Sequence, residues 1–196
     1  YDYKTNDYFS SLDVFSNSSP EFVDIDLDGD LDLFISNQYD LSTSPWVGRI
    51  YFFRNTGNDT NPVYEEETTS FIGKNMGQML SPEFGDLDGD GDMDLLLGDF
   101  NGFIQYHENV STDDELNFNL IGNVGDIDLS GNSVPTLGDL DGDGDLDLLI
   151  GQLNGSLVFH RNMGTNVEHV FMEEEFADVQ VSSNSAPELM DVDDDG

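Results

Sequence analysis

The chain has 196 residues, of which 42 are Asp or Glu and 5 are Lys or Arg, so its formal net charge at pH 7 is −37. Such a surface repels nucleic acid and anionic membranes, and neither is expected as a partner. The 14 Phe and 7 Tyr are ample for a core and argue against disorder. The absence of Cys excludes a disulfide scaffold. No apolar stretch is long enough to span a membrane, so membrane insertion is not expected.

An internal repeat divides the chain into units. Four acidic clusters begin 62, 53 and 52 residues apart, at Asp24, Asp86, Asp139 and Asp191. A Pro stands four residues before each cluster, at Pro20, Pro82, Pro135 and Pro187. These prolines set the limits of three whole units, which we place at 20–81, 82–134 and 135–186.

The first segment, residues 1–19, matches only the last part of a unit, because Phe9 to Pro20 parallels Phe176 to Pro187. We expect it to end a preceding blade. In the unit that follows, the apolar run 33–35 lies between turn signals and predicts a buried strand. A second strand is expected from Ile50.

The connection from Ser36 to Gly48 is longer than its counterparts in the other units, and it carries Tyr39 and the only Trp, Trp46. Aromatic residues on long loops are frequent at binding sites, so these two are candidate ligand-binding residues. The alternative, an aromatic plug that packs against the neighbouring blade, is left open here.

The second and third units repeat the pattern with apolar runs at 95–97 and 148–150. Each run leads into a turn that contains Asn-Gly, at 101–102 and 154–155, which is a strong hairpin signal. His107 and His160 occupy one repeat position and are expected to serve strand packing or to lie on the blade surface. Residues 187–196 begin a further unit.

Each unit therefore holds about four short strands and no helical pattern, which is typical of a sandwich, a barrel or a propeller. The regular repetition of the whole four-strand unit favours the propeller. We predict an all-β chain that forms one partial β-propeller domain over residues 1–196. Its four-stranded antiparallel blades would number three full ones and two partial ones, as a fragment of a longer polypeptide.

The acidic clusters have the chemistry of a cation site. Each complete loop places Asp at positions 1, 3, 5, 7 and 9 and Gly at position 6. Ca²⁺ prefers six to eight oxygen ligands in forgiving geometry, whereas Mg²⁺ demands a near-ideal octahedron. Repulsion among the carboxylates also favours a bound ion. The candidate metal residues are Asp24, Asp26, Asp28, Asp30 and Asp32; Asp86, Asp88, Asp90, Asp92 and Asp94; Asp139, Asp141, Asp143, Asp145 and Asp147; and Asp191, Asp193 and Asp195 of the fourth loop.

Two other interpretations of these loops fail. Acidic turns without a metal would not repeat in identical register three times. An EF-hand needs a bidentate Glu at position 12 and flanking helices, whereas position 12 here is Ile35, Leu97 or Ile150 within a predicted strand.

The loop and the strand after it, as in residues 85–98, resemble the FG-GAP/VCBS repeats of integrin α-subunit propellers and of many secreted bacterial proteins. The resemblance covers essentially the whole chain. It implies a propeller, commonly seven-bladed, that holds Ca²⁺ in the hairpin between the first two strands of a blade. It also implies side-chain ligands at positions 1, 3, 5 and 9 and a backbone oxygen from Asp30, Asp92 and Asp145.

We therefore expect an extracellular, non-enzymatic, calcium-binding module that binds a protein or glycan partner, as in adhesion. The alternative is the propeller part of a secreted polysaccharide-active enzyme, catalytic or lectin-like, because fold alone does not decide function.

Overall fold

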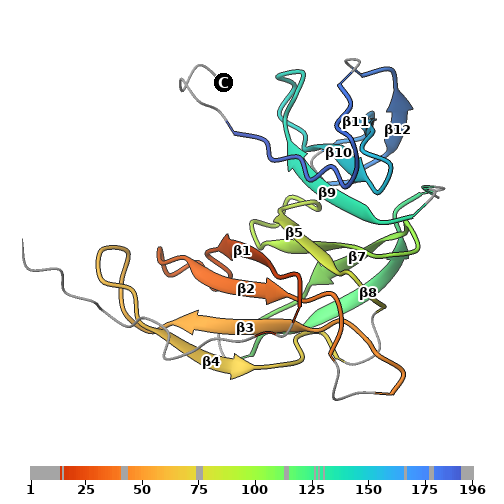
Figure 1. The fold of residues 1–196 in the computed structure, drawn as a ribbon. Helices are drawn as coiled ribbons and strands as arrows, with labels where there is room; N and C mark the ends of the chain where they lie inside the picture. The colour runs from red at the N-terminus through yellow and green to blue at the C-terminus, as the bar shows by residue number, and fades with distance from the viewer. Residues whose placement is uncertain are drawn as a thin grey trace, which may run out of the picture.

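The structure is a computed structural model, and it describes residues 14, 16–40, 44–73, 77–112, 115–125, 127, 129, 131–165, 167–176 and 179–190. All named elements over these residues are strands (Figure 1). They are β1 Ser19–Val23, β2 Asp32–Ser36, β3 Ile50–Asn55, β4 Tyr64–Thr68, β5 Ser81–Gly85, β6 Asp94–Gly98, β7 Ile104–Asn109, β8 Phe118–Asn123, β9 Ser133–Gly138, β10 Asp147–Gln152, β11 Leu157–Asn162 and β12 Phe171–Glu174. The described residues contain no helix that is long and apolar enough to cross a membrane.

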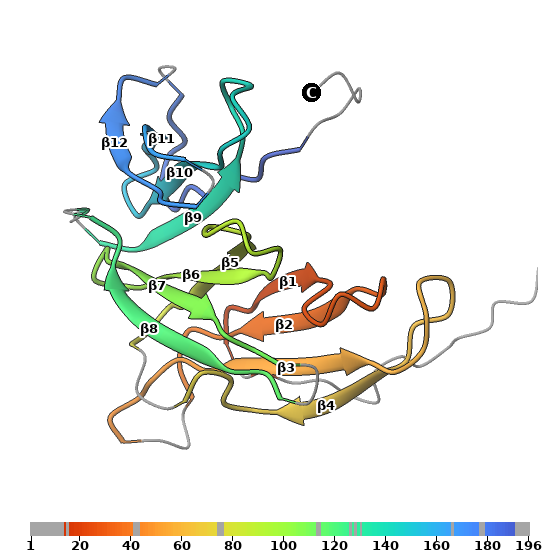
Figure 2. The ribbon, with the colours of Figure 1, turned by 180° about the vertical axis from the view of Figure 1, so that it is seen from behind.

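The strands form three four-stranded sheets, each in the order of the chain: β1–β4, β5–β8 and β9–β12. All pairs inside the sheets are antiparallel. The prediction of an all-β chain with four-stranded, propeller-like blades is confirmed, and the blades do not close into a ring (Figures 1 and 2).

The sheets pack through alternate residues of their central strands. In β6, Leu95 and Leu97 join a cluster with Phe34 and Phe52 of the first sheet. Leu96, between them, joins a second cluster with Leu148 of the third sheet. Since successive side chains of a strand point to opposite faces, one continuous apolar run serves two interfaces. This is why the runs 33–35, 95–97 and 148–150 are apolar at every position.

The first strand of each sheet lies at the inside of this stack. β5 contacts both β1 and β9, which places the three first strands next to one another. The outermost strands β4 and β12 carry mostly exposed side chains. The arrangement is therefore radial, with the first strands innermost.

A close backbone approach links the second and the third sheet to the segment that follows each of them. A Cβ on Gly98 would lie 2.2 Å from the carbonyl oxygen of Ser133, and a Cβ on Gly151 would lie 2.2 Å from that of Ser185. The Ser133 hydroxyl accepts from Asp99 N at 3.0 Å, and the Ser185 hydroxyl accepts from Gln152 N at 2.7 Å. Residues 179–190 thus repeat against the third sheet the contact that β9 makes with the second.

The unit limits at 20–81, 82–134 and 135–186 stay a prediction. The predicted partial blades, 1–19 and 187–196, lie largely outside the described residues.

Candidate metal centres

The three complete Asp loops join the first two strands of each sheet: 24–31, 86–93 and 139–146. Their tight course needs backbone with positive φ. The second loop uses Gly89 and Gly91 at 76° and 96°, and the third repeats this with nearly the same angles. In the first loop Leu27 takes the position of Gly89, at φ 57°, which costs a non-Gly residue about 1 kcal/mol.

The Asp at position 1 organises each loop by accepting from backbone N–H groups. Asp24 accepts from Asp28 at 3.0 Å and from Gly29 at 2.9 Å. Asp86 accepts from Gly89 at 2.7 Å and from Gly91 at 3.1 Å. Asp139 does the same from residues 142, 143 and 144. These bonds wrap the loop around one carboxylate.

Three carboxylates then converge in each loop. Each of three residues offers an oxygen, and these oxygens lie within 4.8 Å of one another. The groups are Asp24, Asp26 and Asp28; Asp86, Asp88 and Asp90; and Asp139, Asp141 and Asp147. The first two groups take loop positions 1, 3 and 5, whereas the third takes positions 1, 3 and 9.

The Asp at position 9 is buried and fixes the third strand of its sheet. Asp94, 1% exposed, accepts from Asn109 N at 2.7 Å, Leu87 N at 3.0 Å and the Tyr106 hydroxyl at 3.0 Å. Asp147 binds the N–H groups of residues 140 and 162 in the same way. This carboxylate therefore connects the loop to the end of β7 or β11.

The first loop differs at this position. Asp32 Oδ1 accepts from Asn55 N at 2.6 Å, whereas its buried Oδ2 has no partner with hydrogen-bonding geometry among the described residues, although the Ile25 N–H lies near enough to act against the rise in its pKa. Burial raises the pKa of Asp32, and likewise of Asp94, to about 6. A buried carboxylate oxygen without a partner is the environment that a nearby cation would stabilise.

The donors fit a hard divalent cation. All side-chain donors in these groups are carboxylate oxygens, which hard cations prefer, and each group presents three of them close together. Each of the three clusters could therefore hold a metal ion.

The remaining predicted residues lie near these groups but outside them. Asp30, Asp92 and Asp145 donate their N–H to the Asp at position 5, at 2.9–3.0 Å. Asp143 accepts one of these bonds, and Asp32 and Asp94 bind the third strand. Whether these residues act as ligands stays a prediction. Asp191, Asp193 and Asp195 lie outside the described residues.

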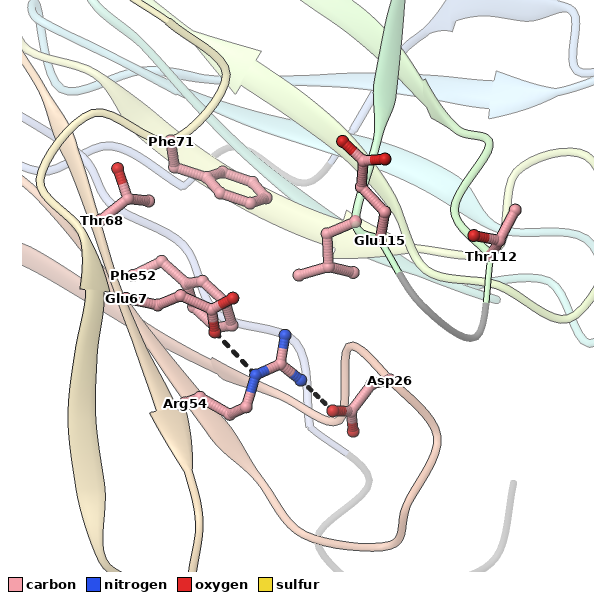
Figure 3. Close-up of a pocket in the computed structure, with 9 residues that line it drawn as sticks. Asp26, Phe52, Arg54, Glu67, Thr68, Phe71, Thr112 and Glu115 are labelled. Atoms are coloured by element: carbon pink, nitrogen blue, oxygen red, sulfur yellow. Dashed lines mark hydrogen bonds and ion pairs between the residues drawn. The ribbon is translucent and has the colours of Figure 1, made fainter.

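Two arginines that the sequence analysis did not single out lie against these loops. Arg54 of β3 forms ion pairs with Asp26 and, at 2.7 Å, with Glu67 (Figure 3). Arg161 of β11 forms the same pairs with Asp141 and, at 3.1 Å, with Glu174. The signal was present in the sequence, since two of only five basic residues share one repeat position.

Arg54 also lies beside a pocket of about 570 Å³ between the first and second sheets. Its guanidinium stands 5.2 Å from the centre of the Phe52 ring, a cation–π contact. Thr112 and Glu115 line the opposite side of this pocket (Figure 3).

Tyr39 and Trp46 lie together in the long connection between β2 and β3. Their rings stack with centroids 5.6 Å apart, and Trp46 is 54% exposed. Trp46 borders a groove of about 590 Å³ that also includes the exposed ring of Phe100, and none of the residues that line the groove is charged. These lining residues are Pro45, Trp46, Val47, Gly77, Gln78, Phe100 and Asn101.

Residues 24–97 match the FG-GAP-like repeat family. The match begins at the first Asp of the first loop and ends in β6, after the second loop. Comparison with curated proteins and with solved structures gave no match.

Proposed function

We propose that this chain, which carries an FG-GAP-like repeat over residues 24–97, is a calcium-binding propeller module that acts outside the cell and binds a partner without catalysis. The observation that carries the proposal is the threefold recurrence of three convergent carboxylates in one hairpin of each sheet. Ca²⁺, when bound, supplies positive charge to these carboxylates.

Calcium suits these loops better than magnesium. Two of the groups use loop positions 1, 3 and 5, and the third uses positions 1, 3 and 9. Ca²⁺ tolerates such variation in ligand geometry better than Mg²⁺ does. Many extracellular calcium modules bind in the range of about 10⁻⁴–10⁻³ M. An affinity in this range, measured for these loops, would favour the extracellular location.

Thermal unfolding with and without metal tests the calcium role. An ion that binds only the folded chain adds about 2.7 kcal/mol per site at one hundred times its Kd. We expect a clear rise of Tm with millimolar Ca²⁺, a smaller rise with Mg²⁺, and reversal by chelator. Asp90→Asn should reduce the rise, whereas Asp59→Asn, which removes the same charge from an exposed turn outside the loops, should not. An unchanged Tm in chelator would refute calcium binding.

For the partner, we propose a neutral glycan bound in the groove beside Trp46. Exposed aromatic rings offer flat apolar faces, and the amides of Gln78 and Asn101 offer donors and acceptors for hydroxyl groups. The lack of charge in this lining is unusual for a chain with 42 acidic residues. A protein partner is the other interpretation of the same surface.

Glycan-array binding tests the groove. We expect Trp46→Ala to abolish binding and Phe22→Ala, which removes an exposed aromatic ring of β1, to leave it unchanged. Retained binding by Trp46→Ala, or binding to proteins only, would contradict the glycan proposal. The groove and the first Asp loop lie at opposite ends of β2, so calcium removal should weaken binding only where it also unfolds the chain.

A further inference from the structure

The three Asp loops differ in one neighbouring residue. The fifth residue of the third strand in each sheet is Arg54 in β3, Glu108 in β7 and Arg161 in β11. In every case it precedes the Asn whose N–H binds the Asp at position 9. The position is thus fixed relative to the loop, and only its charge changes.

In the first and third sheets the arginine binds the loop itself. Nη1 of each arginine pairs with the Asp at position 3, which is Asp26 or Asp141. Nε of the same arginine pairs with a Glu of the outer strand, Glu67 in β4 or Glu174 in β12. Figure 3 shows the Arg54 guanidinium between Glu67 and Asp26. Both Asp26 and Asp141 belong to the convergent carboxylate groups. The carboxylate of Asp26, and likewise that of Asp141, therefore pairs with a guanidinium and also belongs to the group that could hold a metal ion.

The second loop has no such partner. None of the ion pairs found over the described residues involves residues 86–94. Glu108 instead adds a sixth carboxylate to the neighbourhood, and its charge acts on Tyr106, whose hydroxyl binds Asp94. The first and third loops each have five Asp and an arginine that also pairs with a Glu of the outer strand, whereas the second has five Asp and Glu108, and no ion pair among the described residues brings a cation to it.

We propose that Arg54 and Arg161 are built-in counter-ions that weaken calcium binding at the first and third loops, and that the second loop is the tight site. This inference rests on the proposed calcium-binding function. A cation must either displace the guanidinium from Asp26 or Asp141 or bind beside its positive charge, and both options reduce affinity. In the absence of metal, the arginines compensate part of the repulsion among the carboxylates of these two loops, whereas the second loop lacks this compensation.

Calcium titration by isothermal calorimetry on the whole chain separates the sites. We expect the wild type to show one tight site and two sites weaker by about tenfold or more, which corresponds to about 1.4 kcal/mol. Asp90→Ala should remove the tight site, and Asp28→Ala should remove a weak one, because Ala supplies no oxygen ligand. Arg54→Gln and Arg161→Gln should each convert one weak site to a tight site, and Glu108→Arg should convert the tight site to a weak one.

Arg49→Gln is the matched control, because Arg49 pairs with Asp40 at 2.7 Å away from the loops and its loss changes the net charge equally. Its titration should match that of the wild type. Three equal affinities, or an effect of Arg54→Gln no greater than that of Arg49→Gln, would overturn the counter-ion proposal while calcium binding stands. A wild type that binds no calcium at millimolar concentration would overturn both.

Discussion

Replacement of Asp94 separates the structural role of the Asp loops from the metal-binding role proposed for them. Asp94→Ala removes the acceptor of three buried donors: Leu87 N at 3.0 Å, Asn109 N at 2.7 Å and the Tyr106 hydroxyl at 3.0 Å. Each buried donor without a partner costs about 1–3 kcal/mol. Water that enters the vacated space relieves part of this, so we expect a loss of about 3–6 kcal/mol in the free energy of unfolding. Urea denaturation in chelator measures it.

A matched variant of the same loop gives the opposite pattern. Asp90 is exposed, and among the described residues its carboxylate accepts from Asp92 N alone, at 2.9 Å. In chelator, Asp90→Ala should change stability by less than about 1 kcal/mol, the range of exposed substitutions. In excess calcium it should lose the stabilisation that the wild type gains from the metal. Equal effects of the two variants in chelator would refute the division of roles.

The milder variant Asp94→Asn keeps the structural role of Asp94 testable if Asp94→Ala does not fold. Its amide oxygen still accepts from Asn109 N, and the Tyr106 hydroxyl can rotate to accept from the amide nitrogen. Only Leu87 N loses its acceptor, so the expected loss in chelator is about 1–3 kcal/mol.

Three further substitutions follow from buried groups. Burial raises the pKa of Glu83 from 4.5 to about 8, so Glu83 should lower stability as pH rises from 4.5 to 8, by up to about 1.4 kcal/mol per pH unit. Glu83→Gln, which still accepts from Leu137 N, should reduce the slope measured in urea titrations by this amount, and the smaller slope that remains comes from Glu21, Asp32 and Asp94, whose pKa values are also raised. Burial lowers the pKa of His107 from 6.5 to about 4, so His107 should lower stability as pH falls through this range. The change in Tm caused by His107→Phe should therefore be more favourable at pH 5 than at pH 7.5. An equal change in Tm at the two pH values would contradict this. Gly98→Ala should cost about 1–3 kcal/mol, because its Cβ would lie 2.2 Å from the Ser133 carbonyl oxygen; an unchanged urea midpoint would exclude the clash.

Much of the fold could be predicted because the repeat supplies independent copies of each signal. The apolar runs at 33–35, 95–97 and 148–150 each lie in a fully buried strand, as expected. The Asn-Gly turn at 101–102 does follow β6 and lead into β7. Local composition was sufficient here, since burial on both faces requires apolar residues throughout.

Other features depend on how the strands curve and could not be read from spacing. The third and fourth strands of the first two sheets shift register, between Phe52 and Phe53 and between Tyr106 and His107. The bond from Asn109 N to Asp94 joins residues fifteen positions apart and exists only because β6 and β7 pair in that register. The ion pairs of Arg54 arise likewise from the approach of β3 to the loop before β2.

The position of the long connection at the far end of β2 has a consequence for how such a chain can vary. Five residues of strand, roughly 17 Å at about 3.4 Å per residue, stand between that connection and the first Asp loop. Segments of different length and chemistry can be exchanged at the far end without disturbing the spacing of Asp24, Asp26 and Asp28. A change in the connection between β2 and β3 therefore leaves the candidate metal site at the other end of β2 unaltered.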